Sequence, residues 1–225
     1  LHSQGTLHIT GELRFDTTHG LIIQAHASGD RVQVMGTPEY HVQASPDLQL
    51  TVKGRRIEVD GEVVIPEANL RPRDLSGAVS PSDDVVIVNA EGAPAGSQPR
   101  WQIYSQIRLR LGDFVKFNGF GLKGLVTGDL TLTEAPQRPT TGRGELGIKN
   151  GEYKAYGQKL TIARGRLLFF GAGVDKPGLD VRAIRQVQQV TAGIQVSGSL
   201  KSPTVQIFSE PAMSQGDALS YLILG

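Results

Sequence analysis

The stretch from Gly119 to Thr133 constrains the fold more than any other part of the sequence, because its apolar residues recur at every second position. Its even positions carry Phe, Leu, Val or Gly, whereas its odd positions are mostly small or polar. Side chains alternate between the two faces of a β-strand, so this period predicts a strand with one apolar face. At about 3.3 Å per residue the strand would be on the order of 45 Å long. Glycines on its apolar face allow it to bend.

The same two-residue period recurs along most of the chain and predicts an all-β fold of long antiparallel strands. We expect hairpin turns at Asn118–Gly119 and Asn150–Gly151. Pro66 is expected to end its strand, because proline cannot donate to a β-ladder. The predicted strands are 7–15, 21–27, 31–35, 48–52, 57–65, 101–111, 114–117, 119–133, 146–148, 153–156, 160–170, 179–183, 190–200 and 204–208.

A short sequence motif recurs in these strands: a glycine, then an acidic residue, then three residues of which the first and third are apolar. It occurs at Gly11, Gly61, Gly128 and Gly144 with unequal spacings, so the chain is not a solenoid of fixed period. Glycine inside a strand marks a bend or a close approach of two backbones. We therefore expect one kind of bend to be used repeatedly.

Two regions depart from the strand pattern. Five prolines interrupt residues 66–100, where only Val85–Val88 resembles a strand, so we predict a long, mobile loop region there. Ser214 and Asp217 fit a helix capping box, which predicts a terminal helix over 214–225. The expected organisation is one β domain over 1–213 followed by this helix. Because the apolar pattern continues to the last residues, we expect a piece of a longer protein.

Composition excludes several classes of function. The chain has 23 Lys and Arg against 22 Asp and Glu, so its overall charge gives no reason to expect nucleic acid or an anionic membrane surface as partner. The absence of cysteine excludes disulfides and thiolate metal sites. No apolar run approaches the roughly 18 residues of a membrane-spanning helix, and the first residues lack the features of a signal peptide.

Several motifs resemble active sites but have simpler explanations. Residues 119–124 and 142–147 match a dinucleotide-binding fingerprint, yet period-two segments follow them where a helix is needed. The five histidines show no metal-ligand spacing. Glu58, Asp60 and Glu62 are expected to be a solvated strand face, and the four arginines at 55, 56, 71 and 73 a plain surface. We expect no catalytic, metal or cofactor site, and predict that the protein is not an enzyme.

The apolar strand faces must be covered by something. Each exposed Val, Leu, Ile or Phe forfeits roughly 1.5–3 kcal/mol of burial, and a single short helix cannot cover more than ten strands. A sandwich or a closed barrel lets the faces meet one another, and periodicity alone favours these arrangements. An incompletely closed, U-shaped sheet is the alternative, and it would leave an apolar groove suited to an extended acyl chain.

A resemblance changes this balance towards the U-shaped sheet. The last sixty residues resemble the C-terminal domain of the TamB family, and the middle of the chain is similar at Gly54–Ala68. The segments that carry the C-terminal resemblance are Leu167–Gly171, Pro177–Ala183, Arg185, Gly193, Val196, Gly198, Pro203, Phe208–Pro211, Ser214–Gln215 and Ala218–Gly225. No single motif is decisive, but the ordered series covers most of the chain. Before Leu48 the resemblance is only general.

The resemblance implies a β-taco, a long U-shaped half-pipe with a hydrophobic inner face. Proteins of this family are anchored in the inner membrane of Gram-negative bacteria, cross the periplasm and pair with the outer-membrane barrel TamA. The implied function is a conduit segment for phospholipid transport between the two membranes, linked to outer-membrane protein assembly and secretion. The implied partners are phospholipid acyl chains, TamA and unfolded outer-membrane proteins. A chaperone-like scaffold that presents strand edges to barrel proteins is the alternative.

If the sheet is a lipid groove, a set of bulky aliphatic residues should point into it. Acyl chains need apolar contact and no polar site. The expected groove residues are Ile103, Ile107, Leu109, Leu122, Val126, Leu130 and Leu132, with Leu146, Ile148, Ile194 and Val196 as additional candidates.

Overall fold

The computed structural model describes residues 5–17, 20–72, 101–155 and 157–223. These residues form twelve strands and one short helix. The strands are β1 Thr6–Asp16, β2 Gly20–Asp30, β3 Val32–Gly36, β4 Tyr40–Lys53, β5 Arg56–Leu70, β6 Gln102–Gly119, β7 Leu122–Glu134, β8 Thr141–Ala155, β9 Gln158–Gly173, β10 Gly178–Val187, β11 Val190–Ser199 and β12 Ser202–Glu210, and the helix is α1 Gln215–Ile223. Most of these strands are far longer than the usual five or six residues.

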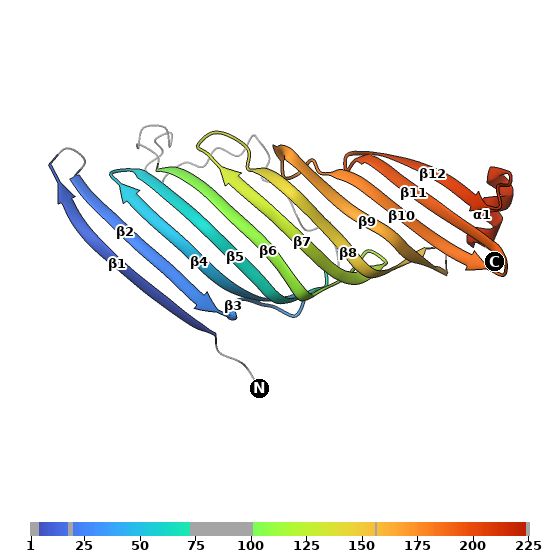
Figure 1. Ribbon diagram of the computed structural model, residues 1–225, viewed down its shortest axis with the longest axis horizontal. Coiled ribbons are helices and arrows are strands. Elements are labelled where there is room, and N and C mark those ends of the chain that lie inside the picture. Colours follow the sequence, from blue (N-terminus) through green and yellow to red (C-terminus); the bar gives the residue numbers. More distant parts are fainter. Residues whose placement is uncertain (1–4, 18–19, 73–100, 156, 224–225) are drawn as a thin grey trace, which may run out of the picture.

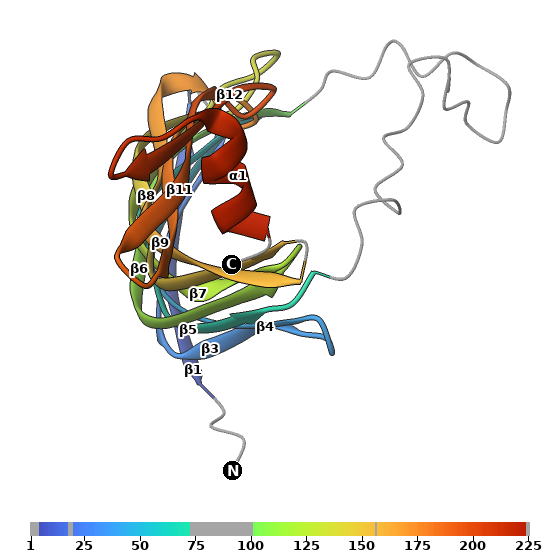
Figure 2. The same ribbon diagram turned by 90° about the vertical axis from the view of Figure 1, so that its right-hand side faces the viewer.

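All strands belong to a single sheet with the order β1-β2-β4-β5-β6-β7-β8-β9-β10-β11-β12, and β3 pairs with β4 beside this path. Neighbouring strands are antiparallel except for β5 and β6, which are parallel. Figure 1 shows the strands side by side along the molecule, and Figure 2 shows them curling around an axis that runs across the strands. The sheet is therefore an open half-pipe, which confirms the predicted U-shaped all-β fold with a short C-terminal helix.

The sandwich and closed barrel that periodicity alone favours are wrong. The two outermost strands of the sheet, β1 and β12, do not pair with each other among the described residues, so the sheet has two edges. Alternation along a strand reports only that one face is apolar, and it carries no information on which strands meet. Curvature and the helix settle how much of that face is covered.

Recurring glycines adopt backbone conformations that disfavour any other residue. Gly61, Gly128 and Gly144 all adopt positive φ angles, of 143°, 123° and 141°, which side chains with a Cβ rarely adopt. A Cβ at Gly128 would overlap the carbonyl oxygen of Glu145 on the neighbouring strand. Gly11, the fourth occurrence of the motif, does not have a positive φ. A conformation that favours glycine is thus present at three of the four positions, and the bend itself stays a prediction.

Pro66 does not end its strand, which continues to Leu70. The pairing register with β4 shifts here, because Ser45 pairs with Val64 whereas Gln43 pairs with Glu67. Pro66 therefore lies in a β-bulge. The residue in a bulge is not paired in the ladder, so a proline without an N–H is tolerated there. The predicted loop region is wrong for residues 66–70. Residues 73–100, including the predicted strand Val85–Val88, lie outside the described part of the chain.

Both predicted hairpin turns lie elsewhere. Gly119 pairs with Leu122, so the tip between β6 and β7 is Phe120–Gly121, whose φ angles are 52° and 80°. Asn150, with a φ of 50°, lies inside β8, where the register with β7 shifts. Asn-Gly favours left-handed backbone in a bulge as well as in a turn. Asn150 therefore marked the left-handed conformation but not a turn, whereas neither Asn118 nor Gly119 has a positive φ.

The helix begins where the capping box predicts it, and Ser214 caps it, although Asp217 bonds to the Ser214 hydroxyl and not to its backbone N–H. The N–H of Asp217 donates to Oγ of Ser214 at 3.2 Å, and that hydroxyl donates to Oδ2 of Asp217 at 2.6 Å. The helix packs against β10, β11 and β12 inside the curve of the sheet (Figure 2). Its buried Leu222 joins a core cluster, which comprises Leu160, Ile162, Ala183, Ala192 and Leu222.

Candidate functional site on the inner face of the sheet

The face that carries α1 is the inner face of the half-pipe. Residues directly opposite each other on neighbouring strands share a face. Val126 pairs with Ile148, Leu109 with Leu130, and Ile107 with Leu132. Continuing this pairing through all strands places every expected groove residue on the inner face: Ile103, Ile107, Leu109, Leu122, Val126, Leu130, Leu132, Leu146, Ile148, Ile194 and Val196.

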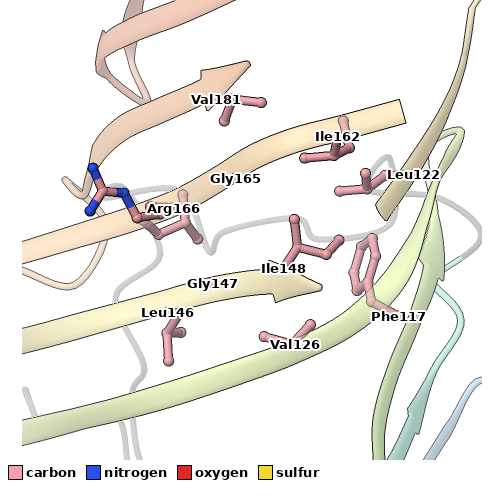
Figure 3. A pocket seen from close by; sticks show the side chains of 11 residues that line it. Phe117, Leu122, Val126, Leu146, Gly147, Ile148, Ile162, Gly165, Arg166 and Val181 are labelled. Atoms are coloured by element: carbon pink, nitrogen blue, oxygen red, sulfur yellow. The ribbon is translucent and has the colours of Figure 1, made fainter. Parts of the chain in front are cut away.

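The inner face contains an apolar cavity of about 230 Å³ near the ends of β6–β9. Figure 3 shows Phe117, Leu122 and Ile148 close together at one end of it. Four of the expected groove residues line it, namely Leu122, Val126, Leu146 and Ile148. The remaining lining residues are Phe117, Gly147, Ile162, Gly165, Arg166, Leu167 and Val181.

The backbone at the cavity is shaped by glycine. Gly147 pairs with Thr127 and so faces outward, where an added Cβ would meet its nearest neighbours only at 3.7 Å. A Cβ at Gly165 would instead overlap Cγ2 of Ile148. Arg166 brings no free charge to the cavity, because its Nε donates to Oδ2 of Asp180 at 3.1 Å. The cavity therefore offers contact with carbon almost exclusively.

Sequence reasoning missed Phe117, Ile162, Leu167 and Val181. Bulges interrupt the alternation in or beside their strands, for example between Leu111 and Lys116 of β6 and between Arg182 and Ala183 of β10. Each bulge adds residues to one strand. Beyond the bulge, the inward-pointing residues change from odd-numbered to even-numbered positions or the reverse. A register could be recovered only by pairing each strand with its neighbour, and single-strand periodicity does not supply that pairing.

The inner face is open towards β1 and covered towards β12. Ile9, Leu13 and Phe15 of β1 pair with inner residues of β2, and their exposed fractions are 67%, 71% and 81%. At the other end, Ile194 and Ile207 pack against the core cluster that includes Leu222 of α1. The apolar surface thus runs the length of the half-pipe, and among the described residues only those at the α1 end shield it.

Side-chain hydrogen bonds attach the last turn of α1 to the sheet. Nη1 of Arg185 donates to the carbonyl oxygens of Tyr221 and Leu222, at 3.1 and 3.2 Å. Nε2 of Gln158 donates to the carbonyl oxygen of Ile223 at 2.9 Å. The last carbonyls of a helix lack intrahelical partners and carry partial negative charge, so both contacts are favourable.

The outer face carries paired charges. Nη2 of Arg110 lies 2.9 Å from Oε2 of Glu62, and the guanidinium of Arg56 pairs with Glu58 and stacks 3.9 Å from the ring centre of Tyr104. This arrangement agrees with the expected solvated strand face. Within the described residues, no group of three or more His, Asp or Glu side chains is placed to hold a metal ion.

Asp180 is the centre of the densest charge cluster on the outer face. Hydrogen bonds from Arg166, together with the positive charges of Arg164 and Arg166 and a hydrogen bond from Gln195, hold the pKa of Asp180 below its ordinary value. Partial burial opposes this shift, but it is the weaker influence. The Asp180 carboxylate therefore remains ionised and joins β9, β10 and β11 across the outer face.

No helix in the described ranges is long and apolar enough to cross a bilayer.

The family model of the TamB C-terminal domain matches residues 1–225. The translocation and assembly module subunit TamB of Haemophilus influenzae is 28% identical over 236 aligned positions. The match covers 97% of this chain but only 18% of that relative's length. Because the family model matches from the first residue to the last, the chain belongs to the TamB C-terminal domain family.

Proposed function

We propose that this chain is a segment of a hydrophobic conduit for phospholipid transport across the periplasm, between the inner and outer membranes of a Gram-negative bacterium. The observation that carries the proposal is the continuous apolar inner face, which extends from β1 to the cavity beside Leu122 and Val126. An acyl chain needs a long apolar surface without polar docking groups, and the half-pipe has this form. The conduit has no enzymatic step.

Membership of the TamB family supports the setting of this proposal. The matched Haemophilus relative bears the name of a translocation and assembly module subunit. We propose that the present chain works in the same kind of module, with the barrel protein TamA as its outer-membrane partner and an inner-membrane anchor elsewhere in the full protein. Outer-membrane protein assembly would then depend on the lipid that the conduit delivers.

The proposal is tested by placing a charge on each face of one strand. Val126→Asp puts a carboxylate into the cavity, where it loses hydration without gaining a partner. Thr127→Asp, one residue along β7, puts the same charge on the outer face. Native mass spectrometry of protein purified without detergent should show at least about fivefold less bound phospholipid for Val126→Asp. Thr127→Asp should retain the wild-type amount.

A second variant and a control separate loss of lipid from loss of fold. Leu146→Trp fills the cavity without adding charge and should also lower lipid occupancy, and thermal melting of each variant reports its stability. The proposal is overturned if both faces lose lipid equally, or if Val126→Asp and Leu146→Trp lose lipid only in proportion to unfolded protein. Absence of phospholipid from the wild-type chain would overturn it directly.

A chaperone-like scaffold for outer-membrane barrel proteins is a second candidate, favoured by the free edge of β1. This strand is eleven residues long and has β2 as its one neighbour among the described strands. An extended segment can add to such an edge through backbone hydrogen bonds. Binding of an unfolded barrel strand by lipid-free protein would favour the scaffold, and loss of that binding when lipid is present would favour the conduit.

A further inference from the structure

The overall charge of the chain conceals a local cluster of lysines. The strand ends 116–119, 122–125, 149–155 and 158–161 contain five lysines and one acidic residue, Glu152. We name this segment the lysine lip; its lysines are Lys116, Lys123, Lys149, Lys154 and Lys159. All five are exposed, and within the described part of the chain none of them forms an ion pair.

The register brings these lysines together at one end of four adjacent strands. Lys154 pairs directly with Lys159, and Lys123 pairs with Glu152 of the same strand as Lys154. Four strands spaced about 4.8 Å apart span only about 15 Å. Unpaired like charges this close together repel one another, so the cluster is costly unless an anion binds to it. Charges elsewhere on the outer face form pairs, for example between Arg110 and Glu62.

The lysine lip borders the apolar cavity. Phe117 and Leu122 line the cavity from inside, and the residues next to them, Lys116 and Lys123, are exposed on the other face. In Figure 2 these strand ends form one margin of the open side of the half-pipe. A lysine side chain is long enough to extend around such a margin while its stem contacts apolar surface. Positive charge is therefore available where a ligand in the cavity would emerge.

The hairpin tip beside the lysines carries an unusual residue. Phe120 has a φ of 52°, and the residue is 53% exposed. Asn or Gly satisfies this left-handed position at lower cost, so the turn itself does not explain a phenylalanine. An exposed aromatic ring next to lysines suits the boundary between the apolar and polar parts of a lipid.

From these observations we propose that the lysine lip holds the phosphate headgroups of phospholipids whose acyl chains lie in the cavity. The lip thereby favours lipids of net negative charge, such as phosphatidylglycerol, over zwitterionic phosphatidylethanolamine. This inference rests on the proposed conduit function and adds a headgroup preference to it. Each lysine near an anionic headgroup favours it by about fivefold at physiological ionic strength, and the preference should weaken as salt screens the charges.

The test measures which lipid the protein takes from a mixture. The 225-residue chain is incubated with vesicles of equimolar phosphatidylglycerol and phosphatidylethanolamine, repurified, and its bound lipids are counted by mass spectrometry. Wild-type protein should enrich phosphatidylglycerol at least about fivefold. Lys123→Gln/Lys154→Gln/Lys159→Gln should bring the ratio close to one while total bound lipid falls less than about twofold, since the cavity is unchanged.

A matched control removes three cations from the opposite strand ends. Lys53, Arg55 and Arg138 are exposed and have no ion pair among the described residues, so Lys53→Gln/Arg55→Gln/Arg138→Gln loses the same charge away from the cavity. This variant should keep the wild-type lipid ratio. Equal ratios in all three proteins, with lipid still bound, would overturn the lysine-lip proposal alone. Absence of lipid from all three would overturn the conduit function, and the headgroup preference with it.

Two further measurements distinguish other anions from a carried lipid. Titration with inorganic phosphate alone tests for a free-anion site. If phosphate binds to wild type and not to the lip variant while the lipid ratios stay equal, the lip is such a site and the proposal is wrong. Co-sedimentation with intact phosphatidylglycerol vesicles tests for membrane docking. Lip-dependent sedimentation without any lipid preference in the repurified protein would likewise refute headgroup binding by the lip.

Discussion

Nη1 of Arg185 lies 3.2 Å from the carbonyl oxygen of Leu222, and this contact fastens the end of α1 to the inner face of β10. A cation at a helix C-terminus also interacts favourably with the helix dipole. Arg185→Ala should therefore lower the free energy of unfolding by about 1–2 kcal/mol in urea denaturation. Lys53→Ala, at an exposed and unpaired lysine, should change it by less than about 0.5 kcal/mol. Equal effects of the two substitutions would show that the Arg185 contact does not hold the helix.

The positive-φ positions Gly128 and Gly144 should tolerate no side chain. An added Cβ at Gly144 would overlap the carbonyl oxygen of Asp129, and one at Gly128 would overlap that of Glu145. We expect Gly128→Ala and Gly144→Ala each to cost about 2 kcal/mol or more, since strain and steric overlap combine. Gly147→Ala is the control on the same strand as Gly144, because its Cβ would make only ordinary contacts. A cost at Gly147 as large as at Gly144 would contradict this explanation.

Asp180 should make stability depend on acid pH. The pKa of Asp180 is lowered in the folded state by its hydrogen bonds from Arg166 and the nearby positive charges. Its contribution is thus fully present above the ordinary carboxyl pKa of about 3.9 and is lost as the pH falls through the lower folded value. Asp180→Asn should lower the free energy of unfolding by about 1 kcal/mol at pH 7.

The difference between Asp180→Asn and wild type should shrink below about pH 4, where wild type also loses the charge. Thermal melting at a series of pH values measures this difference. Arg166→Gln removes the partner and should produce the same acid behaviour, and the double variant should add little to either single one. A difference that is constant down to pH 2 would show that the ion pair is not its source.

Removal of α1 should expose the covered end of the inner face. A chain ending at residue 213 lacks Leu222, so Ile194 and Ile207 lose the cluster that they pack against. We expect stronger fluorescence of a dye that binds apolar surface, and a free energy of unfolding lower by about 2–4 kcal/mol. Ser214→Ala, which removes only the helix cap, should cost about 1 kcal/mol and give an intermediate signal. Unchanged dye binding by the shortened chain would mean that α1 does not cover this surface.

Local patterns predicted much of the fold. The alternation over 7–15 corresponds to β1, and the Ser214–Asp217 box gives the start of α1. Gly61, Gly128 and Gly144 marked positions where the backbone has a positive φ angle. The same local reasoning placed two turns wrongly. At Asn150 the left-handed backbone belongs to a bulge, and the turn expected at Asn118–Gly119 lies two residues later, at Phe120–Gly121. The prediction that the strand ends at Pro66 was also wrong, because a β-bulge accepts proline just as a strand end does.

By itself the sequence determined that the strands are long and have one apolar face, because period-two alternation is a property of neighbouring residues. It also determined which side of most strands is apolar, so all the expected groove residues lie on one face. Only the tertiary structure decided that the sheet stays open, that bulges bring Phe117 and Ile162 to the same cavity as Leu122, and that α1 covers one end. These features depend on pairing and curvature between residues far apart in the chain, and no local period records them.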